Sequence, residues 1–283
     1  MNTTAMTISM NKTSRLLLRA LCALTLPAAI AAGPAAIAAP AATDLITNGS
    51  FSTWTGRAPA GWIGTPSLAK GIDLGGDAGS NAAFVHRTGE PDAHAFGELR
   101  QNFANAIEGD FTLSFDFTLN KQAGWGQNLI VSLYTDTAKF WNSAWLQFRF
   151  GGADGGQASP DNDLTGNSYL YLYDDKAEGS KKWFLPPAGV TAVKGSDYNP
   201  KAKSFTGAPQ IYQATLAYSA SANTYSISYG PLNGAKTTHS GIATFGTASK
   251  GKGVKGVRFY GGSDGGALVD RVSLLVPAAA ANP

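Results

Sequence analysis

Three side chains between residues 145 and 149 have the chemistry that sugar recognition needs. Trp145, Gln147 and Arg149 alternate with apolar residues, so that in a strand they share one face. An indole can stack on a pyranose ring, and an amide and a guanidinium can bind hydroxyl groups. We expect this face to line a cleft or to meet solvent. The alternative is a second packed layer in which Arg149 pairs with a carboxylate.

Further aromatic residues could extend such a surface. Tyr169, Tyr171 and Tyr173 alternate with leucines and would stand about 6.7 Å apart along one face of a strand. They could form a stacking track, but tyrosine is also simply a favoured strand residue. Trp125 lies between two glycines and Trp183 in a Lys-Lys-Trp-Phe segment. Both are expected in loops, where an exposed ring could contact a ligand.

Catalytic chemistry finds less support in the sequence. Hydrolysis of a glycosidic bond needs two carboxyl groups that flank it. None of the glutamates after residue 41 lies in the Glu-x-Asp-x-x-Glu pattern of laminarinase-like jelly rolls: Glu90, Glu98, Glu108 and Glu178. A lyase could combine a histidine with tyrosine and arginine, for example His86 with Arg149. Only the residue types support that pairing.

One segment resembles the first half of a calcium-binding loop. Asp161-Asn162-Asp163-Leu164-Thr165-Gly166 has the spacing of its first ligands, which include Asp161 and Asp163. The twelfth position, where such loops carry glutamate, is Leu172. The loop could still bind calcium weakly, and the alternative is a polar turn without a metal.

The elements that would position these residues are short strands. Period-two alternation is clearest in 111–119, 129–134, 145–150 and 169–173, in a hairpin of 212–218 with 225–229, and in 256–260 and 268–275. Glycine contributes 34 of the 283 residues and charged residues only 14%, which suits a turn-rich β protein. We predict an all-β fold, an antiparallel sandwich of the jelly-roll type.

The first 41 residues resemble a secretory signal peptide. Lys12, Arg15 and Arg19 precede an apolar stretch, and Ala36-Ile37-Ala38 fits a small-x-small cleavage site. Residues 42–283 would form one sandwich domain with long loops near 151–168 and 176–210. Such an alanine-rich leader predicts secretion, to the periplasm or the extracellular space, and favours a bacterial source. The single cysteine, Cys22, lies in this leader, so no disulfide is expected.

The charge balance limits the partners. Removing the three basic residues of the leader from the 22 in the chain leaves 19, which equals the 19 acidic residues. A neutral body gives no electrostatic reason to expect nucleic acid as a partner. Arg19 and Pro27 interrupt the apolar stretch of the leader, which argues against an integral membrane anchor.

An ordered set of short motifs resembles the jelly-roll carbohydrate-binding modules of the galactose-binding-like superfamily, the kind that binds cellulose or xylan. The set comprises Leu45-Ile46-Thr47-Asn48-Gly49-Ser50-Phe51, Pro59-Ala60-Gly61-Trp62, Leu99-Arg100-Gln101-Asn102-Phe103, Gly109-Asp110-Phe111-Thr112-Leu113-Ser114-Phe115-Asp116, and Leu268-Val269-Asp270-Arg271-Val272-Ser273-Leu274. These motifs span residues 45–275. Residues 150–210 match no part of the pattern, so a related concanavalin-like sandwich is an alternative. The resemblance implies a structural calcium ion with Asp270 as a ligand, although Ser52 replaces the usual acidic residue after Phe51.

Taken together, these features predict a secreted, non-catalytic protein that binds a polysaccharide or oligosaccharide. The first alternative is a jelly-roll polysaccharide lyase or glycoside hydrolase, which would need a catalytic cluster inside a groove. The second is a structural cell-surface or matrix sandwich, which would have a sheet face covered by loops and no exposed aromatic residues.

Overall fold

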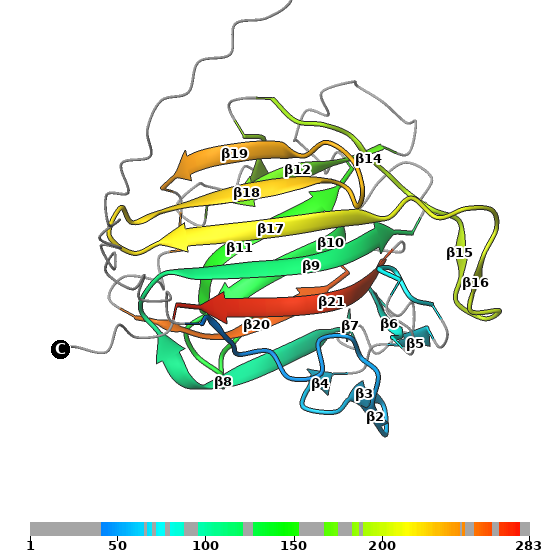
Figure 1. Ribbon diagram of the computed structural model, residues 1–283, viewed down its shortest axis with the longest axis horizontal. Helices are drawn as coiled ribbons and strands as arrows, with labels where there is room; N and C mark the ends of the chain where they lie inside the picture. The colour runs from blue at the N-terminus through cyan, green and yellow to red at the C-terminus, as the bar shows by residue number, and fades with distance from the viewer. Residues whose placement is uncertain are drawn as a thin grey trace, which may run out of the picture. The chain divides into compact units, whose positions relative to one another are not determined.

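The computed structural model describes residues 41–64, 67–69, 72–76, 80–87, 96–120, 127–152, 167–174, 183–186, 189–243, 245–246, 252–261 and 266–277, all within a compact unit that begins at Pro40. In these residues all the regular structure is β-strand (Figure 1). Neighbouring strands pair antiparallel, as predicted. No helix in this part of the chain is long and apolar enough to span a lipid bilayer.

Two large sheets face each other (Figure 1). Over the described residues, one has nine strands and the other eight. The first runs, in spatial order, β19 (Thr237–Ile242), β18 (Thr224–Pro231), β17 (Tyr212–Ser219), β9 (Phe111–Leu119), β21 (Ala267–Val276), β6 (Ala82–Arg87) and β5 (Ser67–Ala69), with β1 (Thr43–Asp44) on β21 and β7 (Phe96–Gly97) on β6.

The eight-stranded sheet contains the segments singled out above. It runs β13 (Trp183–Phe184), β12 (Asn167–Tyr173), β11 (Ala144–Gly151), β10 (Gln127–Tyr134), β20 (Val254–Tyr260), β8 (Leu99–Ile107) and β4 (Ile63–Gly64), with β14 (Val193–Lys194) on β12. Two small hairpins complete the set, β2 (Trp54–Thr55) with β3 (Ala58–Pro59), and β15 (Tyr198–Asn199) with β16 (Ser204–Phe205). Four of the two-residue strands, β13 to β16, thus lie in the segment 176–210 that the sequence indicated as a loop.

The core lies between the two sheets and is built from the apolar face of each alternating strand. Phe115 of β9 meets Phe259 of β20 with ring centroids 5.1 Å apart, and Phe117 stacks on Phe150 of β11 at 4.6 Å. Each fully buried phenylalanine contributes on the order of 1.5–3 kcal/mol. Because this core occupies one face of each strand, the other face of the eight-stranded sheet carries the residues that remain for function.

Candidate functional site

The outer face of the eight-stranded sheet carries a line of polar and aromatic side chains that crosses six strands. We call it the transverse row, and it consists of Trp183, Tyr173, Gln147, Ser132, Arg258 and Arg100. The strand register brings these residues together, because Trp183 pairs with Tyr173, Gln147 with Ser132, and Arg258 with both Ser132 and Arg100. Five strand spacings give the row a length of about 24 Å.

Local alternation explains why these side chains point outward. On β11, Phe148 and Phe150 belong to the core, which leaves Gln147 and Arg149 on the opposite face. On β12 the leucines belong to the core and the tyrosines lie on the same outer face as Gln147. Arg149 pairs with Tyr171, so the same register brings Tyr173 beside Gln147. The predicted alternation is therefore correct at these positions, but Arg149, Tyr169 and Tyr171 are buried, so this part of the face does not meet solvent as expected.

Arg149 lies between two aromatic rings. Its guanidinium carbon is 4.6 Å from the ring centre of Tyr171 and 4.7 Å from that of Trp183. The Arg149 side chain is fully buried, and so is Tyr171. Such cation–π contacts hold the guanidinium and both rings in fixed positions. Tyr169, two residues earlier on β12, is also buried. Tyr173 and Trp183 remain half-exposed.

The other end of the transverse row is charged. Glu98, Arg100 and Arg258 form an arginine–Glu98 cluster, in which Arg258 donates from Nε to Oε2 of Glu98 at 2.7 Å. Nη2 of Arg258 lies 2.5 Å from the same oxygen, and Nε of Arg100 lies 3.4 Å from Oε1. The Phe140 ring is 3.9 Å from the guanidinium of Arg100 and 5.0 Å from that of Arg258.

Gln147 and Tyr260 connect the middle of the row to this cluster. The Gln147 amide donates to the Tyr260 hydroxyl at 2.5 Å, and the guanidinium of Arg258 lies 3.9 Å from the Tyr260 ring centre. Burial raises the pKa of Tyr260 to about 12. The phenol is therefore neutral at physiological pH and can donate a hydrogen bond.

A loop between β10 and β11 brings an exposed aromatic residue next to the cluster. Phe140 is buried against the two arginines, whereas the side chain of Trp141 is 60% exposed. The two rings meet edge to face, with centroids 4.5 Å apart. Sequence reasoning missed Trp141 as well as Arg258 and Tyr260. Arg258 and Tyr260 alternate with the apolar Val257 and Phe259, and this alternation was the signal that could have identified Arg258 and Tyr260.

Trp145 does not lie on this face, contrary to the prediction. It is only 6% exposed and packs in the core, 4.7 Å from the Tyr218 ring and 4.9 Å from that of Phe245. A β-bulge is the cause, because Leu133 pairs with Leu146 and the next residue of β10 pairs with Ala144. Trp145 is the extra residue, and the bulge turns its side chain toward the core.

The remaining predicted residues fall elsewhere. Trp125, Asp161, Asp163 and residues 1–40 lie outside the described residues. His86, which could have served a lyase together with Arg149, belongs to β6 of the other sheet and stacks on Phe84 at 4.8 Å.

Asp270 is engaged in hydrogen bonds and does not fit a calcium ion. Its carboxylate accepts from the Ser80 hydroxyl at 2.8 and 2.9 Å, from the Leu74 amide at 3.1 Å and from the Arg271 amide at 2.7 Å. These donors point their hydrogens at the oxygens that a cation would need. The described residues also contain no group of three or more His, Cys, Asp or Glu side chains that could hold a metal.

Asp270 also has a second carboxylate beside it. Asp116 of β9 is its register partner, and both are buried on the outer side of the nine-stranded sheet. Asp116 forms an ion pair with Arg271 and accepts from the Gln213 amide at 3.2 Å. Both carboxylates are therefore engaged by protein donors.

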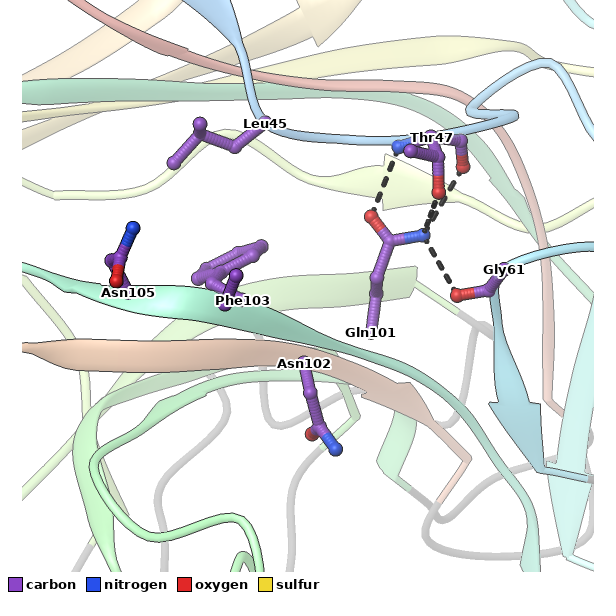
Figure 2. Close-up of a pocket in the computed structure, with 8 residues that line it drawn as sticks. Leu45, Thr47, Gly61, Gln101, Asn102, Phe103 and Asn105 are labelled. Carbon is purple, nitrogen blue, oxygen red and sulfur yellow. Dashed lines mark hydrogen bonds between the residues drawn. The ribbon is translucent and has the colours of Figure 1, made fainter.

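Residues of the ordered motif set hold the N-terminal segment in place through hydrogen bonds. The Gln101 amide donates to Gly61 O at 3.0 Å and to two oxygens of Thr47, while its oxygen accepts from Thr47 N at 3.0 Å (Figure 2). The Trp62 indole donates to Thr47 O at 2.9 Å. Thr47, Gly61 and Gln101 line a cavity of about 330 Å³ beside β8. Because Gln101 is saturated by these contacts, we assign this place a structural role.

Comparison with known proteins finds similarity only to solved structures. No protein-family model matches the sequence, and no curated protein matches it either. The lectin UEA-II complexed with galactose aligns with a TM-score of 0.47 and 11% identity, covering 84% of this chain and 98% of the lectin. Peanut lectin with a nine-residue peptide aligns with a TM-score of 0.46 and 12% identity, covering 81% of this chain and 97% of the lectin. An endo-β-1,4-glucuronan lyase from the fungus Trichoderma reesei aligns with a TM-score of 0.41 and 14% identity, covering 77% of this chain and 92% of the lyase.

Proposed function

We propose that the protein is a secreted, non-catalytic polysaccharide-binding protein whose ligand lies along the transverse row. One observation carries this proposal, namely the alignment of aromatic, amide, hydroxyl and guanidinium groups across six adjacent strands on one sheet face. Rings provide stacking surface, and planar polar groups provide hydrogen bonds to hydroxyl groups. The length of about 24 Å suits an extended polymer better than a single sugar.

The leader supports secretion, because its basic start, apolar stretch and alanine-rich end are typical of a signal peptide. The ordered motifs support a relationship to the galactose-binding-like modules. In the structure those motifs hold the N-terminal segment against β8 and β21, through Gln101, Trp62 and the Val272 N to Gly49 O bond of 3.0 Å. They therefore support a shared framework rather than a shared binding surface.

The chemistry of the row favours binding over catalysis. Glu98 is held between two guanidiniums, so its carboxylate is engaged by protein donors. Tyr260 has its pKa raised to about 12 and is a poor base at neutral pH. No histidine belongs to the transverse row.

A polysaccharide lyase is the second candidate, and one contact favours it. Gln147, Tyr260 and Arg258 are linked on the same face, with 2.5 Å between the Gln147 amide nitrogen and the Tyr260 hydroxyl oxygen. An amide and a guanidinium could neutralise a uronate carboxylate, and a phenol could transfer a proton. With its raised pKa, Tyr260 would serve as an acid more readily than as a base.

The test is retention of the mature protein on insoluble and immobilised polysaccharides, run beside assays for reducing ends and unsaturated products. Retention without product is the expected result. Tyr173→Ala and Gln147→Ala should each weaken retention, while Thr215→Ala on the outer face of the other sheet should not. Product that disappears in Tyr260→Phe would overturn the non-catalytic assignment. The absence of both retention and product would leave a structural sandwich as the better description.

A further inference from the structure

We infer that the ligand is an acidic polysaccharide, and that the arginine–Glu98 cluster binds a carboxylate of one of its uronic acid residues. This inference rests on the proposed function, because it names the class of glycan that the transverse row would take. It begins from the charges at the β8 end of the row, where two guanidiniums share one carboxylate.

The cluster has a surplus of one positive charge in a partly buried place. The side chains of Arg100, Arg258 and Glu98 are 17%, 7% and 15% exposed. Removing a charge from water is unfavourable unless a partner of opposite sign compensates it. Glu98 can compensate only one of the two arginines. A second anion that approaches from solvent would therefore be favoured at this place.

Arg100 is the group positioned to receive that anion. Arg258 meets Glu98 through two nitrogens, at 2.7 and 2.5 Å, and this close pairing fixes both side chains. Nε of Arg100 lies 3.4 Å from Glu98, which is too long for a strong charge-assisted hydrogen bond. Arg100 is also the most exposed member of the cluster. A guanidinium presents a planar fork that matches the two oxygens of a carboxylate.

The surroundings suit a sugar that carries the carboxylate. Trp141 is 60% exposed and stands beside Phe140, whose ring contacts both arginines. Asn102 is exposed, and its side-chain oxygen accepts from the Tyr134 hydroxyl at 2.6 Å, which leaves its NH₂ group to donate. Figure 2 shows Asn102 directed away from Gln101 and Leu45, toward the outer side of β8. An indole, an amide donor and a guanidinium that is only loosely paired with Glu98 are thus found at one end of the row.

The nearby loop does not neutralise the surplus charge. Asp136 is the acidic residue of the β10–β11 loop, and its oxygen accepts from the amides of Ala138 and Lys139 at 2.8 and 3.2 Å. These bonds lower the pKa of Asp136 and hold its carboxylate within its own loop. The same loop carries an exposed lysine, Lys139, of opposite charge.

The first experiment compares polymers that differ only in charge. Polygalacturonate, alginate and polyglucuronate would each be tested beside the methyl-esterified form of the same polymer, with cellulose and xylan as neutral ligands and a sulfated galactan as a different anion. We expect at least one acidic polymer to bind, and esterification to weaken binding about 10-fold or more, the effect of losing a hydrogen bond to a charged group. Sodium chloride should weaken binding to the acidic polymer more than binding to a neutral one.

The outcomes separate the inference from the proposed function. Retention on neutral polymers alone would overturn the acidic ligand and leave polysaccharide binding in place. Preference for the sulfated galactan over every carboxylate polymer would overturn the uronic acid. The absence of retention on any polymer would overturn both the proposed function and the inference.

Variants then locate the carboxylate. Arg100→Gln should weaken binding to the acidic polymer about 10-fold or more, without affecting its methyl ester, and Arg100→Lys should weaken it less. Glu98→Gln should strengthen binding, because it removes the competing carboxylate. Lys201→Gln removes the same charge from the exposed turn between β15 and β16 and should change nothing. Arg100 is not the carboxylate site if Arg100→Gln weakens binding to the acidic polymer and to its ester equally. The same conclusion follows if Arg100→Gln weakens binding no more than Lys201→Gln does.

Folding defects would be detected independently. Each variant would be compared with the parent by its thermal midpoint. If Arg100→Gln is unstable, Trp141→Ala provides a second test at an exposed position. We expect this variant to weaken binding to the acidic polymer and to its ester alike. Unchanged binding of both polymers by this variant would overturn the location of the ligand beside Phe140.

Discussion

Gln101 and Thr47 are joined by three hydrogen bonds across 54 positions of sequence. Thr47 N donates to the Gln101 side-chain oxygen at 3.0 Å, and the Gln101 amide donates to Thr47 O at 3.1 Å and Thr47 Oγ1 at 2.8 Å. A fourth bond reaches Gly61 O at 3.0 Å. One buried side chain thereby fixes the opening segment and the Gly61-Trp62 turn to the inner side of β8.

Gln101→Ala should therefore lower the free energy of unfolding by roughly 2–4 kcal/mol, because it leaves backbone groups of Thr47 and Gly61 without partners. Gln101→Glu should also destabilise the protein, since a carboxylate would face two carbonyl oxygens. Urea denaturation would measure both. Asn105→Ala, an exposed change on the same strand, is the control and should alter stability by less than about 0.5 kcal/mol. Equal midpoints for Gln101→Ala and Asn105→Ala would contradict this role.

Trp145 and Trp141 should respond in opposite ways to the same substitution. Trp145→Ala should cost about 3–5 kcal/mol, because it empties a space between Tyr218 and Phe245 in the core. Trp141→Ala, at a position 60% exposed, should leave stability nearly unchanged and affect ligand binding instead. Denaturant midpoints and polysaccharide retention, measured on both variants, would test this division. A stable Trp145→Ala variant that loses only binding would show that the bulge does not direct this ring inward.

Asp270 should make stability depend on pH. Burial raises its pKa from about 3.8 to about 6 in the folded protein, so the folded state holds a proton that the unfolded state has released between these values. Its contribution is complete below pH 3.8 and is lost as pH rises through about 6, a change of about 3 kcal/mol. Urea denaturation from pH 4 to 7 would show the decline. Asp270→Asn should reduce this decline of stability with pH only in part, because burial also raises the pKa of Asp116. An unchanged slope in Asp270→Asn would exclude Asp270 as the cause.

Gly256→Ala should disturb the outer face beside the arginine–Glu98 cluster. A Cβ atom at residue 256 would lie 2.3 Å from the Tyr134 ring carbon Cζ and 2.6 Å from Gln101 O. The ring would have to move, and its hydrogen bonds to Gln101 O and Asn102 would be strained. We expect a loss of about 1–3 kcal/mol, which is typical of overpacking. Gly109→Ala has open space around it and is the matched control. Similar thermal midpoints for the two variants would contradict the close contact with Tyr134.

The strands and most of their faces could be read from the sequence because alternation is a local property. The predicted strand 111–119 matches β9, and the predicted hairpin corresponds to β17 and β18. Gln147, Arg149 and the tyrosines of β12 lie on the predicted face for the same reason. Trp145 was the exception, because a bulge inserts one residue into β11 without a turn signal in the sequence.

The candidate site was only partly visible, since it is assembled across strands that are distant in the chain. Residues 100, 132, 147, 173, 183 and 258 meet only because β8, β20, β10, β11, β12 and β13 adopt this order. The surplus charge of the arginine–Glu98 cluster likewise depends on a pairing across 160 positions. No periodicity within a single strand contains that information.

By itself, the sequence determined an all-β chain with an apolar and a polar face on each strand, because side chains alternate wherever the backbone is extended. Only the tertiary structure decided which strands became neighbours and in what register. Register is set by packing between sheets and by bulges, and these act between segments far apart in sequence. For that reason Gln101 has a structural role in holding the N-terminal segment, and Trp145 lies in the core. Arg100 and Arg258 form the charged end of the transverse row for the same reason.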